Sequence, residues 1–199
     1  MVTQLNGEDP RVKRTRQLIV QAFTELLAEK SFRAISVQDV AERATVNRAT
    51  FYAHFEDKYA LMDYFIRDSF QQALASKLPA SFPFTLDNLY LLTRTVLEHL
   101  AQFHGQCKVA DKQQFELPPE ATVQNELYKF ISNWLKQVPP PDHQCRATVD
   151  TAAMVMSWAI FGAGLQWSSG SKTVSAEQMA NQIVAVLTRG LSEGITMPA

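Results

Sequence analysis

The stretch that decides the fold is residues 36–55, SVQDVAERATVNRATFYAHF. Ser36, with Asp39 three residues later, has the spacing of a capping box at the start of a helix. Asn47 is a favourable N-cap for a second helix. Residues 45–46 lie between the two and predict a tight turn. The stretch therefore predicts two short helices joined by a turn.

A basic segment lies just upstream, within a predicted helix over residues 11–29. Its basic residues are Arg11, Lys13, Arg14 and Arg16. Its apolar positions recur at helical spacing and predict one inward face. They are Leu18, Ile19, Ala22, Phe23, Leu26 and Leu27. A short helix pair beside a basic segment is the arrangement that presents one helix to the DNA major groove.

Composition and charge agree with this hypothesis. The chain has 199 residues, 46% of them hydrophobic, and its apolar residues recur at helical rather than alternating spacing. We therefore expect an all-α protein with a substantial core. Residues 10–58 hold nine lysines and arginines against six acids, whereas residues 59–199 hold ten against twelve. This asymmetry has the sign expected of an N-terminal nucleic-acid module.

The remaining sequence predicts further helices separated by proline-rich breaks. They are expected over residues 58–78, 86–104, 109–115, 119–137, 142–168 and 175–192. Asp57 is the expected cap of the first of these helices, and Gly162 and Gly164 indicate close helix packing. We expect three parts: a flexible arm over 1–10, a helix-turn-helix DNA-binding domain over 11–57, and a helical ligand-binding and dimerisation domain over 58–199.

Cys107 and Cys145 do not form a disulfide framework, and the N-terminal residues lack the apolar core of a signal peptide. We therefore expect a cytoplasmic protein. The longest nearly apolar run, residues 152–165, is shorter than the roughly 20 residues that span a bilayer, so no membrane association is expected.

The chain resembles the TetR family of bacterial transcriptional regulators. The resemblance runs through residues 14–61 and is strongest over 36–58. It rests on Ser36, Asp39-Val40-Ala41, Asn47, Thr50-Phe51-Tyr52-Ala53-His54-Phe55 and Lys58. The family usually has glycine where this chain has Thr45. If the turn requires a positive φ there, a β-branched residue is a poor occupant.

The candidate DNA-binding residues follow from these positions. They are Arg14, Ser36, Val46, Asn47, Arg48, Thr50, Tyr52, His54 and Lys58. Arg48 is the long bidentate donor on the second helix, and arginine is the commonest reader of guanine. The resemblance implies that Lys58 contacts a phosphate, while Phe51 and Phe55 are expected in the core. Tyr52 and His54 as ordinary surface residues, and the basic segment as a plain solvated face, remain alternatives.

The C-terminal two thirds lacks a recognisable catalytic motif, so we expect no enzyme activity, no cofactor and no metal. Its aromatic residues fit either a core or a small-molecule site. The candidate ligand-binding residues are Tyr64, His99, Phe103, Phe115, Phe130, Trp134, Trp158 and Gln166. The resemblance implies a small-molecule effector, a homodimer formed by the last two helices, and a repressor on a near-palindromic double-stranded DNA operator. A protein partner in place of the small molecule is the alternative.

Overall fold

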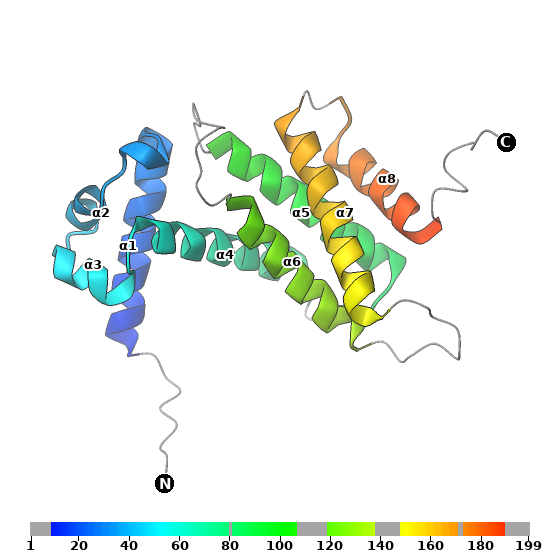
Figure 1. The fold of residues 1–199 in the computed structure, drawn as a ribbon, viewed down its shortest axis with the longest axis horizontal. Coiled ribbons are helices and arrows are strands. Elements are labelled where there is room, and N and C mark those ends of the chain that lie inside the picture. The colour runs from blue at the N-terminus through cyan, green and yellow to red at the C-terminus, as the bar shows by residue number, and fades with distance from the viewer. Residues whose placement is uncertain (1–8, 80, 107–118, 138–147, 171–172, 190–199) are drawn as a thin grey trace, which may run out of the picture. The chain divides into compact units, whose positions relative to one another are not determined.

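The computed structural model describes residues 9–79, 81–106, 119–137, 148–170 and 173–189, and within these ranges the protein is all-α (Figure 1). This confirms the expected fold class. The helices are α1 (Pro10–Glu29), α2 (Val37–Arg43), α3 (Arg48–His54), α4 (Lys58–Lys77), α5 (Leu86–Gln106), α6 (Pro119–Leu135), α7 (Val149–Ser169) and α8 (Ala176–Arg189). A short 3₁₀ turn, η1, covers Phe32–Ala34 between α1 and α2.

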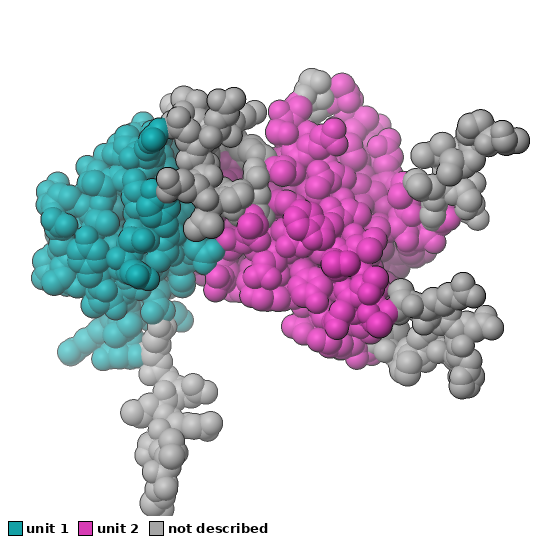
Figure 2. Space-filling view, in the orientation of Figure 1, with its two compact units in different colours: residues 1–65, 106–115 teal, residues 66–105, 116–199 magenta. Residues whose placement is uncertain are grey.

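The chain divides into two compact units (Figure 2). Unit 1 comprises residues 1–65 and 106–115, and unit 2 comprises residues 66–105 and 116–199. Helix α4 contributes its first turns to unit 1 and the rest to unit 2. Most of the expected arm, residues 1–8, lies outside the described residues, as does the expected helix over 109–115.

The core of unit 1 forms from the apolar face of α1 and the aromatic residues of α3. Helix α1 buries five of the six predicted positions, Ile19, Ala22, Phe23, Leu26 and Leu27. The inclusion of Leu18 was wrong, because its side chain is 43% exposed. Phe51 and Phe55 are buried at 0% and 6% exposure, as predicted.

The predicted caps of the short helices are confirmed. The Asp39 N–H donates to Ser36 Oγ at 3.1 Å, and the Ser36 N–H donates to Asp39 Oδ2 at 2.7 Å, which completes a capping box. Asn47 Oδ1 accepts from the Thr50 N–H at 2.7 Å. Asp57 Oδ1 accepts from the Tyr59 N–H at 2.8 Å and from the Ala60 N–H at 2.8 Å, at the start of α4. Each short helix therefore begins at a residue that satisfies its free N–H groups.

The turn between α2 and α3 places Thr45 in the left-handed region, with φ of 58°. The Val46 N–H donates to the Ala41 carbonyl at 2.9 Å, and the Thr45 N–H donates to the Glu42 carbonyl at 3.1 Å. These two bonds form a Schellman motif, whose left-handed position is usually glycine. Of the two possibilities that the sequence left open, a differently built turn or a strained Thr45, the positive φ corresponds to the second.

Unit 2 has a core of leucine, isoleucine, valine and tryptophan side chains on α5, α6 and α7. Gly164 lies so close to α5 that an added Cβ would be 2.9 Å from Leu100 Cδ1, which confirms close packing there. At Gly162 an added Cβ would meet nothing within 4 Å, so Gly162 is not in close contact with another described helix of the same chain. No helix in the described ranges is long and apolar enough to cross a membrane.

Helix α7 begins later than the predicted residue 142. Thr148 has a non-helical φ and ψ, and its side chain accepts from the Thr151 N–H, so the helix starts at Val149. Residues 142–147 lie outside the described residues. In α8, Ser175 Oγ accepts from the Gln178 N–H at 3.1 Å, which sets the start of this helix close to the prediction.

Candidate nucleic-acid interface

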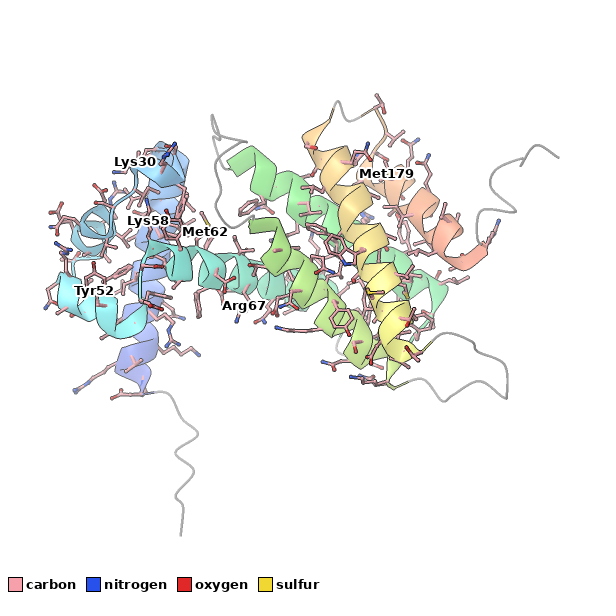
Figure 3. All side chains as sticks on the ribbon, viewed as in Figure 1. Lys30, Tyr52, Lys58, Met62, Arg67 and Met179 are labelled. Atoms are coloured by element: carbon pink, nitrogen blue, oxygen red, sulfur yellow. The ribbon has the colours of Figure 1, made fainter. Side chains whose placement is uncertain are left out.

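Helix α3 presents Arg48 and Tyr52 on its exposed side, while Phe51 faces the core. Figure 3 labels Tyr52 on this helix. Arg48 Nη2 donates to Tyr52 Oη at 3.4 Å, and the guanidinium carbon lies 5.9 Å from the centre of the Tyr52 ring. The one-turn spacing of the two residues brings the phenol against the guanidinium. The arginine is therefore held along the outer face of α3, where a base edge can be reached.

The N-terminus of α3 is suited to an anion. Its first turn contains no acidic residue and begins with Arg48. The Asn47 Oδ1 is used locally, because it also accepts from Thr50 Oγ1 at 3.0 Å. The donors suited to a phosphate here are the backbone N–H groups of the first turn and the Asn47 Nδ2 group.

The N-terminus of α2 is less suited to an anion, because it holds the Asp39 carboxylate. Ser36 Oγ donates to this carboxylate at 2.6 Å, and Lys30 Nζ lies 3.0 Å from it. Hydrogen bonds from Ser36 and the nearby Lys30 ammonium hold the pKa of Asp39 well below its usual range. A fixed negative charge beside Ser36 opposes a second anion there. Any phosphate contact at Ser36 would have to overcome this repulsion.

The other candidates are placed differently. Arg14 is exposed on α1, whereas Arg16 is half-buried with its guanidinium carbon 5.6 Å from the centre of the Tyr64 ring. Val46, Thr50 and His54 are half-buried. The exposed Arg14 is therefore free to extend into solvent, whereas Arg16 packs against a ring within unit 1.

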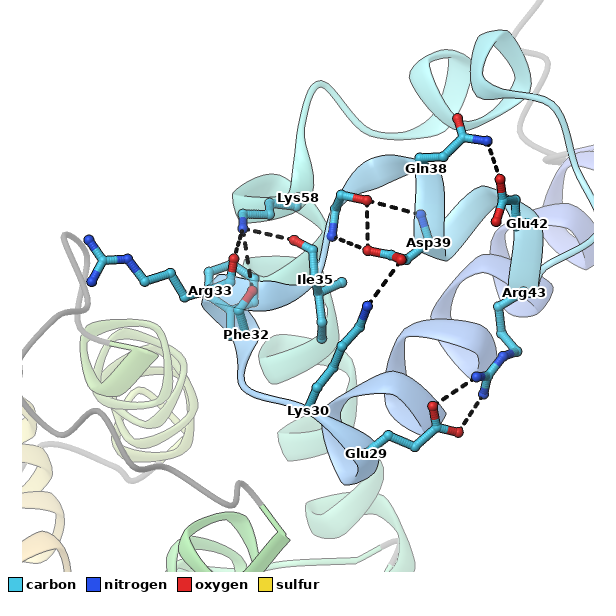
Figure 4. A network of polar contacts seen from close by, with 11 residues as sticks. Glu29, Lys30, Phe32, Arg33, Ile35, Gln38, Asp39, Glu42, Arg43 and Lys58 are labelled. Carbon is cyan, nitrogen blue, oxygen red and sulfur yellow. Dashed lines mark hydrogen bonds and ion pairs between the residues drawn. The ribbon is translucent and has the colours of Figure 1, made fainter.

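A salt bridge that the sequence did not predict joins α2 to α1 (Figure 4). Arg43 donates to both carboxylate oxygens of Glu29, at 2.9 and 2.8 Å, and lies 3.3 Å from Glu25. These hydrogen bonds raise the pKa of Arg43 above its usual range, with Glu29 the larger contributor. Two parallel bonds to one carboxylate fix orientation as well as distance. The orientation of α2, which packs against α3, is thereby fixed to α1.

The resemblance implies that Lys58, the first residue of α4, contacts a phosphate. In the structure its side chain contacts the connection between α1 and α2 (Figure 4). Its Nζ donates to the carbonyl oxygens of Ile35 at 2.8 Å, Arg33 at 3.2 Å and Phe32 at 3.3 Å. Burial and the neighbouring Arg33 guanidinium lower the pKa of Lys58. Sequence reasoning missed these contacts, because carbonyl acceptors carry no side-chain signature.

The described candidate ligand residues belong to four helices, α4 to α7. Phe130 and Trp134 are neighbours, with ring centres 6.3 Å apart, and the Trp134 indole N–H donates to the Phe82 carbonyl. His99 is buried with its ring 5.4 Å from Phe70. Burial, and to a lesser extent Lys77, lowers the pKa of His99 to about 4.

The other candidate ligand residues differ in unit and in exposure. Tyr64 belongs to unit 1, where its ring lies 5.5 Å from Phe55. Phe103 is half-buried on α5, while Trp158 and Gln166 are exposed on α7. Phe115 lies outside the described residues. Across the described side chains, no three histidine, cysteine or acidic residues are grouped as metal ligands.

The arrangement of α1 to α3 defines a helix-turn-helix unit, the class that places its second helix in the major groove. Residues 19–65 match the family model of bacterial regulatory proteins of the tetR family. Over these residues the chain is therefore similar to the TetR family.

Two curated regulators of Bacillus subtilis are similar to part of this chain. YxbF is 36% identical over 76 residues, which are 38% of this chain and 20% of YxbF. YdeS is 40% identical over 70 residues, which are 35% of this chain and 33% of YdeS. The chain therefore aligns with no more than 33% of the length of either relative.

Solved structures extend the similarity to the whole fold. A TetR-family regulator from Syntrophomonas wolfei has a TM-score of 0.64 at 18% identity, covering 94% of this chain and 99% of its own. FadR from Bacillus subtilis, solved with stearoyl-CoA, has a TM-score of 0.57 at 18% identity. The match covers 87% of this chain and 98% of the FadR chain. These two structures share the fold.

Proposed function

We propose that this protein is a sequence-specific DNA-binding transcriptional regulator that acts as a homodimer. The observation that carries the proposal is helix α3, whose first turn has no acid and whose exposed face holds Arg48 against Tyr52. Such a helix can enter the major groove with a donor pointed at the bases and N–H groups pointed at phosphates. Its buried face, anchored by Phe51, fixes which side is presented.

Arg48 is the residue that we assign to base reading. Its two-nitrogen edge matches guanine O6 and N7, and Tyr52 limits the directions in which it can extend. Arg14 and the N–H groups at the start of α3 are assigned to phosphates, with Val46, Thr50 and His54 at the edge of the contact. Ser36 acts through the helix it caps, since its hydroxyl already donates to and accepts from Asp39, whereas Asn47 caps α3 with Oδ1 and is assigned to a phosphate through Nδ2.

The homodimer is supported by an exposed apolar stripe on α7. Met154, Val155 and Trp158 are 49%, 54% and 57% exposed, and Gly162 has open space above it. The spacing of these residues places them on one face of the helix. Val186 on α8 adds an apolar side chain that is 48% exposed. A two-fold pair formed through α7 and α8 would cover these side chains and would require a near-palindromic operator.

Repression and control by a small molecule are the finer parts of the proposal. FadR, which shares the fold, was solved with stearoyl-CoA, and this supports an effector with a long acyl chain. Binding of an effector would weaken DNA binding if it favours a conformation with lower operator affinity. A protein partner acting on the same fold is the alternative, and it would leave DNA affinity unchanged by any small apolar molecule.

The test begins with selection of duplexes from a random-sequence library by the full-length protein, followed by anisotropy measurements on the selected duplex. Arg48→Ala should weaken specific binding by about 1–3 kcal/mol and relax the preference at one base position. Arg14→Ala is the matched comparison, because it should weaken binding to all DNA sequences alike. It should also reduce the slope of log affinity against log salt by about 0.9. Failure to enrich any sequence would refute the proposed function, and an Arg48→Ala variant with full affinity and preference would refute the role of Arg48.

A further inference from the structure

The Lys58 ammonium group is fully used by the protein itself. A lysine ammonium has three N–H donors and no acceptor. Three carbonyl oxygens lie within 3.3 Å of Nζ, those of Phe32, Arg33 and Ile35. All three belong to the connection that leads from α1 into α2. Each donor therefore has an acceptor within unit 1 before any DNA is present.

Two aromatic rings surround the same ammonium group. Nζ lies 4.8 Å from the centre of the Phe32 ring and 5.7 Å from that of Tyr59. The two rings meet edge to face, with centres 5.4 Å apart. A cation near the faces of aromatic rings gains electrostatic stabilisation that is larger where water is partly excluded. The half-buried Lys58 is thus held by carbonyl oxygens and by rings together.

We propose that Lys58 is a positioning residue for helix α2 and does not bind a DNA phosphate. A phosphate could be bound only if the ammonium gave up at least one carbonyl oxygen, and the bond to Ile35 at 2.8 Å is the shortest of the three. Ile35 directly precedes Ser36, the N-cap of α2, so the ammonium fixes where α2 begins. The consequence for DNA binding rests on the function proposed above, whereas the contacts within unit 1 do not.

This role and a phosphate contact make opposite predictions for salt dependence. A phosphate contact releases condensed counterions, and its loss reduces the slope of log affinity against log salt by about 0.9. Loss of a positioning residue displaces α2 and its neighbour α3 but takes no cationic side chain away from a phosphate. It should therefore weaken binding about tenfold at every salt concentration while the slope stays the same.

The experiment compares Lys58→Met with wild type in the full-length protein, because methionine keeps much of the apolar length and removes the ammonium. Loss of a charged donor to several carbonyls should lower the urea midpoint by about 1 M. Lys13→Met is the matched control, since Lys13 is exposed on α1, and its midpoint should not change. Binding is measured on the selected duplex, under conditions where both variants are folded, with Arg14→Ala as the reference for a lost phosphate contact.

A spectroscopic measurement separates the two roles without relying on stability. The Nζ signal of Lys58 in ¹⁵N NMR, assigned by its absence in Lys58→Met, should be protected in free protein and unchanged when the duplex is added. A Nζ signal that shifts on DNA addition, or a slope reduced by about 0.9, would overturn the proposal. Unchanged affinity would reduce Lys58 to a stabilising residue and would also overturn it. If no duplex is selected, the proposed function fails, while an unaltered urea midpoint or an unprotected Nζ signal still refutes the Lys58 contacts.

Discussion

Replacement of Thr45 by glycine should stabilise the turn between α2 and α3. Thr45 is the one non-glycine residue with positive φ in the described ranges, with φ of 58°. It occupies the left-handed position of a Schellman motif, where the bonds from Val46 to Ala41 and from Thr45 to Glu42 require this conformation. The hydrogen bonds that close the helix therefore hold a β-branched residue where its Cβ is crowded.

The magnitude follows from two opposing terms. A left-handed residue with a Cβ is less stable by roughly 1–2 kcal/mol. Glycine also destabilises the folded protein by roughly 0.4–1 kcal/mol, because it increases the conformational entropy of the unfolded chain. The net stabilisation expected for Thr45→Gly is thus roughly 0.5–1 kcal/mol, equivalent to a two- to fivefold change in an opening equilibrium.

Hydrogen exchange of the full-length protein is the suitable assay, because it reports on this turn separately from unit 2. The amides of Ala44 and Phe51, both hydrogen-bonded within the motif and the following helix, should gain two- to fivefold protection. Thr45→Ala is the control, since alanine keeps the Cβ and should gain little. Equal protection in the alanine and glycine variants, or a loss of protection in Thr45→Gly, would refute the reasoning.

Two further predictions concern unit 2. The pKa of His99 is about 4 in the fold and 6.5 in an unfolded chain, so His99 takes up a proton on unfolding when the pH lies between these values. The free energy of unfolding should therefore fall as the pH falls, by about 2 kcal/mol from pH 7 to 5. Urea unfolding should show this loss in wild type and a smaller one in His99→Gln, and parallel pH profiles would rule it out. Trp158→Glu, on the exposed stripe of α7, should raise the concentration at which dimers dissociate at least tenfold in light scattering. Asn133→Glu, at an exposed position of α6, is the control. A Trp158→Glu dimer as stable as the wild-type dimer would place the interface elsewhere.

Local signals in the sequence were sufficient to predict the helix-turn-helix unit. The capping box of Ser36 and Asp39 and the cap at Asn47 depend on residues three positions apart, so spacing alone predicts them. The left-handed Thr45 could also be anticipated, since a helix that must turn sharply leaves one position with positive φ. For this reason the bounds of α2 and α3 were predicted closely.

Features that depend on distant residues could not be predicted in this way. Leu18 follows the apolar period of α1 but is exposed, because a period says which residues share a face and not how much of that face a neighbour covers. The bond between Arg43 and Glu29 joins two helices, and the sequence offers many other pairings of opposite charge. The early start predicted for α7 overlooked Thr148, whose capping role depends on backbone angles.

Helix α4 is where the proposed regulation can be given a physical form. In unit 2, Gln71 donates to Glu126 on α6 at 3.1 Å, and Lys77 pairs with Glu98 on α5. In unit 1, Lys58 at the start of the same helix is bonded to the connection before α2. An effector can shift the equilibrium only by binding better to one arrangement of α4 than to another. A change of α4 that reached its first turn would either carry the start of α2 with it or break three hydrogen bonds at once. The Lys58 contacts therefore favour the first outcome, in which the DNA-reading helices respond together.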